Sequence, residues 1–189
     1  MSFLLIFAGK AGTGKTTLAR SIAEETGTAY IDYDTLCQSF LEAIEEKDGL
    51  GDDDRYGFYR IWRKPCYDSV KDIMVENLSL GVSLIVSAPF TRELQDENYI
   101  EKLKTAAGKD FSYLLCYMAP EEEKHFEMIK ERDSRRDEDF INNKERFSTT
   151  FAAEEPKWEK ENTLILTSGN FETNKEIVIK RVNTLRRHI

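Results

Sequence analysis

The chain has 189 residues, enough for one domain with a full-sized hydrophobic core, and we expect a single domain over residues 1–189. An apolar fraction of 40% and a charged fraction of 33% are ordinary for a globular protein and argue against wholesale disorder. The net charge of −8 argues against binding to long nucleic acid, which needs a broad basic face, but it is compatible with a small basic pocket for one anionic substrate.

Cysteine and histidine usage gives no sign of a disulfide framework or a metal site. Cys37, Cys66 and Cys116 form no C-x-x-C pair and lie in apolar segments, so we expect buried thiols and a reducing, cytoplasmic setting. His125 and His188 have charged neighbours, and we predict that both lie at the surface and bind no metal. No apolar run is long enough to cross a membrane, and the first eight residues lack the basic flank of a signal peptide.

The first predicted element is a buried strand over residues 3–8, followed by the sequence GKAGTGKT at 9–16. This sequence matches the phosphate-loop pattern G-x-x-x-x-G-K-[ST], in the expected position between a strand and a helix. Glycines permit a tight turn whose N–H groups face a polyphosphate, the lysine ammonium reaches the β- and γ-phosphates, and the last hydroxyl is placed to hold Mg²⁺. The predicted nucleotide-binding residues are Gly12, Thr13, Gly14, Lys15, Thr16 and Thr17.

The rest of the chain alternates between predicted helices and strands. Helical periodicity is found at 15–26, 35–46, 56–64, 65–80, 99–108, from 120 onward, at 139–151 and at 173–187, and the split at 64/65 comes from the cost of Pro65 inside a helix. Further strands are predicted at 29–31, 82–86, 111–118 and 163–167, and a glycine- and aspartate-rich loop at 49–57. Five strands alternating with helices predict an α/β fold with a parallel sheet covered on both faces.

Two carboxylates, Asp32 and Asp34, follow the second strand at the sheet edge where the phosphate loop lies. Residues two apart in extended backbone face the same side, so we expect both side chains to point toward the site. Asp34 is the candidate that receives the acceptor's hydroxyl proton, and Asp32 would support the metal or the acceptor. The alternative is that Asp34 only caps the following helix.

A charged stretch between the fourth and fifth strands contains Arg132, Arg135 and Arg136. We interpret residues 132–150 as a lid whose Arg132 and Arg136 close over the transferring phosphate, where planar, permanently charged donors meet the developing negative charge. The alternative is a solvated helix held by salt bridges with the interleaved acidic residues.

Two more arginines are candidates for substrate binding. Arg63 lies at the predicted break before Pro65, and Arg92 follows the third strand. Either could clamp an anionic or polyol substrate, and a purely solvated position is about as plausible for both.

The order of the phosphate loop, the D-x-D at 32–34 and the late arginine cluster resembles small P-loop kinases of the nucleoside monophosphate kinase superfamily. The closest resemblance, carried also by 32–36, 77–81 and 86–94, is to AAA_33-type ATP-binding proteins, relatives of shikimate kinase, polynucleotide kinase and zeta-toxin domains. It implies a three-layer P-loop NTPase fold with a five-stranded parallel sheet and an arginine-bearing lid, and adenine contact at Asn170. The chain departs from these relatives at Ser87, where an acidic residue is common, and lacks the glycine-rich segment that binds shikimate.

Together these features predict an ATP-dependent phosphotransferase that moves the γ-phosphoryl group to a hydroxyl of a small-molecule acceptor. We expect ATP and Mg²⁺ as cofactors, with Thr16 and Asp32 at the metal, and a monomer or homodimer in the cytoplasm. Two alternatives stay open at this point: a polynucleotide 5′-kinase acting on a single-stranded end, and a nucleotide-gated ATPase or binding module without a small acceptor.

Overall fold

The structure is a computed structural model that describes residues 2–48, 55–132, 138–151, 154–167 and 170–187. The elements in chain order are β1 (Phe3–Gly9), α1 (Lys15–Thr26), β2 (Ala29–Asp32), α2 (Tyr33–Asp48), α3 (Arg55–Ser79), β3 (Leu84–Ser87), the 3₁₀ turn η2 (Glu93–Gln95), α4 (Tyr99–Ala107), β4 (Ser112–Met118), α5 (Glu122–Glu131), α6 (Glu138–Ile141), α7 (Lys144–Phe151), the 3₁₀ turn η4 (Lys160–Asn162), β5 (Thr163–Leu166) and α8 (Phe171–Arg187).

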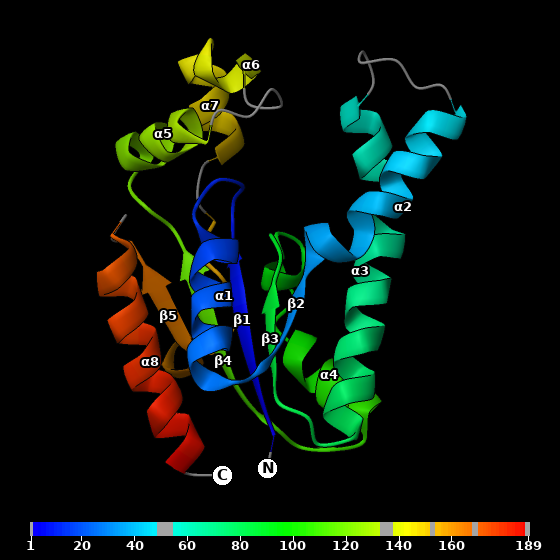
Figure 1. The fold of residues 1–189 in the computed structure, drawn as a ribbon, viewed down its shortest axis with the longest axis vertical. Coiled ribbons are helices and arrows are strands. Elements are labelled where there is room, and N and C mark those ends of the chain that lie inside the picture. The colour runs from blue at the N-terminus through cyan, green and yellow to red at the C-terminus, as the bar shows by residue number, and fades with distance from the viewer. Residues whose placement is uncertain (1, 49–54, 133–137, 152–153, 168–169, 188–189) are drawn as a thin grey trace.

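The five strands form one sheet in the order β2-β3-β1-β4-β5, and every neighbouring pair is parallel. β1 lies in the middle, with Leu5 opposite Ile85 of β3 on one side and Leu114 of β4 on the other. The α/β fold with a five-stranded parallel sheet, predicted from the alternation of apolar runs and helical stripes, is confirmed. Figure 1 shows α5, α6 and α7 above the carboxyl end of β1, and the upper ends of α2 and α3 beside them on the right.

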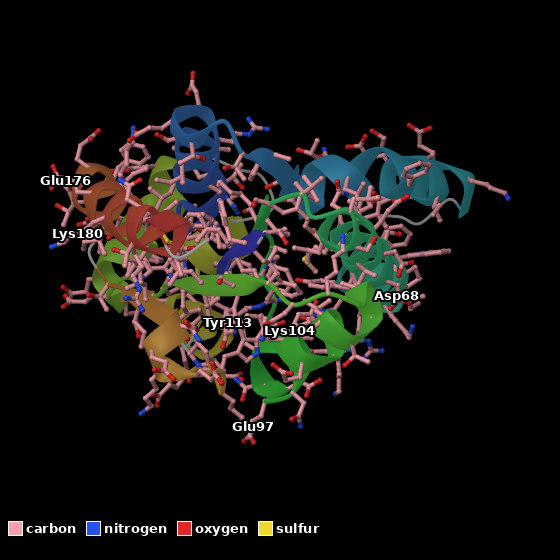
Figure 2. The ribbon with its side chains drawn as sticks, turned by 90° about the horizontal axis from the view of Figure 1, so that it is seen from below. Asp68, Glu97, Lys104, Tyr113, Glu176 and Lys180 are labelled. Atoms are coloured by element: carbon pink, nitrogen blue, oxygen red, sulfur yellow. The ribbon has the colours of Figure 1, made fainter. Side chains whose placement is uncertain are left out.

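Helices cover both faces of the sheet, which explains why β1 is apolar at every position. On one face Leu4 and Ile6 pack with residues of α3 and α4, and on the other Leu5 and Phe7 pack with residues of α1 and α8. Figure 2, seen from below, shows the two helical layers on opposite sides, with the exposed Asp68 on α3 and the exposed Glu176 and Lys180 on α8. The outer faces of the layers are charged, and the faces toward the sheet form the core.

Helix α3 runs without a break through Pro65, so the predicted split of 56–80 at this residue is wrong. A proline inside a helix costs about 3 kcal/mol, and burial on both sides of it offsets this cost. On either side of Pro65, Phe58 and Cys66 pack against α2, while farther along Met74 and Leu78 are buried against the sheet. The predicted loop at 49–57 is helical from residue 55, and its residues 49–54 lie outside the described part of the chain.

The segment predicted as one helix at 139–151 is two helices, α6 and α7. The side chain of Asn143 accepts a hydrogen bond from the backbone N–H of Arg146 at 2.9 Å, as an N-cap does, and this starts α7 as a separate element. The expectation of buried core thiols is confirmed for Cys37, Cys66 and Cys116, which are all free. Within the described ranges, no helix combines the length and the apolar character needed to cross a bilayer.

Candidate active site

The segment from residue 9 to residue 16 joins β1 to α1 as a compact loop at the carboxyl edge of the sheet. Gly12 (φ 75°) and Gly14 (φ 82°) adopt left-handed backbone conformations that a residue with a Cβ rarely takes. The carbonyl of Gly14 accepts the first hydrogen bond of α1 from Leu18 at 3.0 Å, so the loop leads directly into the helix N-terminus. Thr17, on the first turn of α1, is exposed. A glycine-rich loop followed by a helix N-terminus is a backbone site for phosphate.

The side chain of Lys15 lies back inside this loop. It is only 8% exposed, and its Nζ donates to the carbonyl of Lys10 at 2.5 Å and lies 3.5 Å from Oγ1 of Thr13. Thr13 is itself buried and donates from Oγ1 to the same carbonyl at 2.9 Å. One ammonium is therefore held by oxygens of the loop, at the position where the sequence pattern predicts a phosphate-binding cation.

The carboxylate of Asp32 joins the phosphate loop to the second strand and the second helix. Its Oδ2 accepts from the hydroxyls of Thr16 at 3.1 Å and Tyr30 at 2.9 Å, and its Oδ1 accepts from the backbone N–H of Thr35 at 3.0 Å. The carboxylate is 8% exposed. Burial, followed by the neighbouring Asp32 charge, raises the pKa of the Tyr30 phenol to about 12. Asp32 thus orients the Thr16 hydroxyl by accepting its hydrogen bond.

Asp34 lies in a different environment, and the expectation that both aspartates face the same side of an extended segment is wrong. Helix α2 begins at Tyr33, so Asp34 is in its first turn and is exposed. The N-cap is Asp32, whose carboxylate accepts the N–H of Thr35, and not Asp34. A cap at the last strand residue starts the helix two residues earlier than the apolar pattern indicates, so Asp34 lies in a helix and is exposed while Asp32 is buried.

Arg63 forms a two-pronged ion pair with Glu93, with nitrogen–oxygen distances of 3.1 and 2.7 Å. The two side chains are 18% and 14% exposed, and the Arg63 guanidinium lies 3.9 Å from the centre of the Tyr67 ring. Such a fork satisfies both carboxylate oxygens. The structure therefore places Arg63 in a contact between α3 and η2, with its guanidinium engaged by the residue that follows Arg92.

The backbone after β3 has one unusual residue, Phe90, with φ of 52°. Positive φ in a large aromatic residue is strained and needs support from its surroundings. Its N–H donates to the phenol oxygen of Tyr67 at 2.9 Å, its carbonyl accepts from the N–H of Leu94 at 2.9 Å, and its side chain is fully buried. These contacts fix the path of residues 90–94, which carry Arg92.

An open hollow of about 660 Å³ lies between the phosphate loop, the segment after β3 and the end of α7 with the chain that follows it. Its lining residues are Lys10, Ala11, Pro89, Thr91, Arg92, Gln95, Thr150 and Glu154. Lys10 donates from Nζ to the carbonyl of Thr150 at 3.3 Å, and the N–H of Gly9 donates to the carbonyl of Pro89 at 3.3 Å, so these three segments are joined. The structure thus brings Arg92 to the phosphate loop, as the edge rule for parallel sheets predicts.

Helix α5 packs directly on the phosphate loop. A Cβ at Gly12 would lie 2.3 Å from Cδ1 of Ile129, and one at Gly14 would lie 3.5 Å from Cε of Met128. Arg132 follows one turn later, half-buried at the end of α5, with its N–H donating to the Met128 carbonyl at 3.2 Å. The structure thus places Arg132 at the C-terminal end of α5, about one turn beyond Met128 and Ile129, which lie against the loop. The other two arginines of the cluster, Arg135 and Arg136, lie outside the described residues.

The prediction that His125 lies at the surface is wrong. It is 4% exposed, its Nε2 is 2.7 Å from the carbonyl oxygen of Ala11, and its ring packs edge-on against Phe147. The charged neighbours in the sequence hid this position, because they occupy the other faces of α5. A helical stripe through His125 and Ile129, four residues apart, was the signal that could have found it. His188 lies outside the described residues.

Asn170 begins the last helix. Its side-chain oxygen accepts from the backbone N–H of Thr173 at 2.9 Å, which is an N-cap contact for α8. Asn170 is exposed, and its two predecessors in the predicted turn, Ser168 and Gly169, lie outside the described residues. The contact gives Asn170 a structural role that the resemblance to adenine-binding loops did not include.

Comparison with known proteins agrees with this architecture. A protein of Schizosaccharomyces pombe (strain 972 / ATCC 24843) named "Probable gluconokinase" is 35% identical over 87 residues, which are 46% of this chain and 43% of that protein, so the match spans less than half of the curated relative. A crystal structure of a candidate kinase from Chloroflexus aurantiacus J-10-fl has a TM-score of 0.64 at 20% identity and 97% coverage of both chains. A sugar kinase from Janibacter sp. HTCC2649 has a TM-score of 0.57 at 19% identity, covering 97% of this chain and 95% of that one.

The two structures share the fold along nearly the whole chain. The family model described as "AAA domain", AAA_33, matches residues 4–155, which contain the phosphate loop, Asp32, the loop after β3 and α5. This chain belongs to the AAA_33 family.

Proposed function

We propose that this chain is a kinase that transfers the γ-phosphoryl group of ATP to a hydroxyl of a small, anionic polyol. The observation that carries the proposal is the position of the phosphate loop, with Lys15 inside it, at the rim of a hollow that Lys10 and Arg92 line. A phosphate donor in the loop and an acceptor in the hollow would be adjacent. Adjacency of the two substrates is the main requirement of phosphoryl transfer, since catalysis rests on positioning and charge.

ATP would bind to the loop and to the N-terminus of α1. The ammonium of Lys15 would exchange the Lys10 carbonyl for phosphate oxygens, because a full negative charge is a stronger acceptor than a carbonyl. Arg132, at the C-terminal end of α5, would add a second positive charge to the phosphate site. We further propose that residues 132–150 form a lid that also brings in Arg136, and that residues 1–189 act as one kinase domain.

The residues present fit a bound Mg²⁺ ion. Thr16 donates its hydroxyl proton to Asp32 at 3.1 Å, and a hydroxyl with its proton engaged has its lone pairs available for a hard cation. Thr16 would be a direct ligand and Asp32 would orient it. When bound, Mg²⁺ would neutralise charge on the transferring phosphate.

The two aspartates would have separate roles. Both oxygens of Asp32 already accept hydrogen bonds from protein groups, so this carboxylate would brace the site and not take up a proton from the acceptor. Asp34 is exposed in the first turn of α2, at the same edge of the sheet, and would receive the acceptor's hydroxyl proton.

The lining of the hollow indicates the acceptor class. The cations of Lys10 and Arg92 suit a carboxylate or phosphate group, and the polar side chains of Thr91 and Gln95 suit hydroxyls. By their names, one relative, the probable gluconokinase, acts on a sugar acid, and another, the sugar kinase, acts on a sugar. We therefore place sugar acids and sugars first among the candidate acceptors.

The test is incubation of the protein with ATP, Mg²⁺ and pooled sugar acids, sugars, nucleosides and shikimate, with mass spectrometry of the products. We expect a phosphorylated sugar acid or sugar with the native chain and none with Lys15→Ala. Asp34→Asn should lose transfer and keep ATP binding, while Arg92→Gln should raise the KM for an anionic acceptor more than it changes the KM for ATP. Equal turnover by the native chain and Lys15→Ala would overturn the proposal.

A further inference from the structure

Helix α5 touches the phosphate loop through a hydrogen bond as well as through apolar contacts. Nε2 of His125 lies 2.7 Å from the carbonyl oxygen of Ala11, in a position that is 4% exposed. A carbonyl oxygen only accepts hydrogen bonds, so Nε2 carries the proton and donates it. The contact spans 114 residues of sequence.

This hydrogen bond bears on the orientation of one peptide group of the loop. The peptide between Ala11 and Gly12 is planar and trans, so its carbonyl and its N–H point in opposite directions. Holding the Ala11 carbonyl toward α5 therefore turns the Gly12 N–H away from α5. Gly12 has a left-handed conformation, and because glycine adopts positive and negative φ about equally well, the residue by itself does not fix the orientation of this peptide.

The imidazole is itself fixed on several sides. Its ring packs edge-on against Phe147 of α7, with 5.3 Å between ring centres, and Ile129 lies one turn farther along α5 against Gly12. A donor held in one orientation loses little entropy when it makes its hydrogen bond. A buried, oriented donor on a phosphate-loop carbonyl is more than core packing requires, because an apolar side chain would fill the same space.

We propose that His125 is a positioning residue for the phosphate loop: it holds the Ala11–Gly12 peptide so that the Gly12 N–H is presented to the nucleotide phosphates. The inference rests on the proposed nucleotide-binding function of the loop. It links α5 to the affinity for ATP, although α5 carries no residue of the phosphate-loop motif.

Two amide substitutions test the hydrogen bond. In His125→Gln the amide nitrogen is as many bonds from Cα as Nε2 is in histidine, whereas in His125→Asn it is one bond short. Phe126→Leu is the matched control for packing, because Phe126 contacts the same Phe147 ring, at 5.0 Å, and has no contact with the loop among those described. For each protein, the Kd for ATP is measured by equilibrium binding and the thermal midpoint is measured without ligand.

We expect His125→Asn to weaken ATP binding roughly tenfold, as loss of one buried hydrogen bond does, and His125→Gln to stay within about threefold of the native Kd. Phe126→Leu should lower the thermal midpoint and leave the Kd within about twofold of the native value. The inference is overturned if His125→Asn and His125→Gln bind ATP equally well, or if Kd follows the thermal midpoint in all three variants. Failure of the native chain to bind ATP would instead refute the proposed function, so the two failures are distinguishable.

Discussion

The close contact between Gly12 and helix α5 makes Gly12→Ala a sharp test of how the phosphate loop is packed. A Cβ at this position meets Cδ1 of Ile129 at 2.3 Å and Cγ1 of the same side chain at 3.1 Å. The backbone there has φ of 75°, which costs a residue with a Cβ about 1–2 kcal/mol. Overpacking of a filled core adds about 1–3 kcal/mol. We therefore expect Gly12→Ala to lower the free energy of unfolding by about 2–5 kcal/mol.

Gly14→Ala is the matched control, since it shares the backbone strain and lacks the clash. Its φ is 82°, but the nearest atom to a Cβ there is Cε of Met128 at 3.5 Å, an ordinary contact. Gly14→Ala should therefore lose only the strain of about 1–2 kcal/mol. The difference between the two variants measures the contact with Ile129.

The assay is urea unfolding of both variants, followed by the fluorescence of the chain's two tryptophans. A double variant with Ile129→Val, which removes Cδ1, completes the design. Alone, Ile129→Val should cost about 0.5–1.5 kcal/mol, and in the double variant most of the overpacking should disappear, which gives a coupling of about 1–3 kcal/mol. Equal losses for Gly12→Ala and Gly14→Ala, or strict additivity with Ile129→Val, would refute the packing of α5 on the loop.

Three further variants test single contacts. Tyr67→Phe leaves the buried N–H of Phe90 without its acceptor and should cost about 1–3 kcal/mol in urea unfolding; a loss below about 0.5 kcal/mol would contradict the support of the strained loop. Burial and then Asp32 raise the pKa of the folded Tyr30 phenol to about 12, so the native chain loses the stability contributed by the protonated phenol as pH rises from 10 to about 12. In Tyr30→Phe the free energy of unfolding should therefore fall less steeply over this pH range than in the native chain. An unchanged slope would argue against this role of Tyr30. Asn170→Ala should lower the free energy of unfolding by about 1 kcal/mol, and Asn170→Asp should lower it little, because aspartate also caps helices. If Asn170→Ala instead loses affinity for ATP and keeps the native thermal stability, Asn170 contacts the nucleotide.

The fold was largely predictable from the sequence, because its strongest signals are local. The helix predicted at 15–26, with its end at Gly27, has the observed bounds, and Gly27 caps it with φ of 62°. The strand before the phosphate loop begins at Phe3, as predicted, because an apolar run of this length is typical of a strand buried on both faces of a parallel sheet. Periodicity and glycine positions are properties of a few neighbouring residues, and no knowledge of tertiary contacts is needed to use them.

The site was predictable in part, and the failures share a physical cause. The misplacement of Asp34 came from one capping hydrogen bond at Asp32, which starts α2 early. The cost of Pro65 inside α3 is offset because neighbouring residues of α3 are buried against α2 and the sheet, which lie far from Pro65 in sequence. The buried position of His125 depends on a carbonyl 114 residues away. In each case a tertiary contact outweighs a local propensity, and composition within a short window carries no record of it.

The central place of β1 in the sheet has a consequence for the order in which the protein can form. Both hydrogen-bonding neighbours of β1 come later in the chain, β3 at Leu84–Ser87 and β4 at Ser112–Met118, and the helix that packs on the loop ends at Glu131. A ribosome makes the phosphate loop before either of these strands, and the strand beneath the loop gains its second neighbour only after Met118 has emerged. The nascent chain therefore carries its phosphate-loop sequence well before the strands and the helix that support the loop can form.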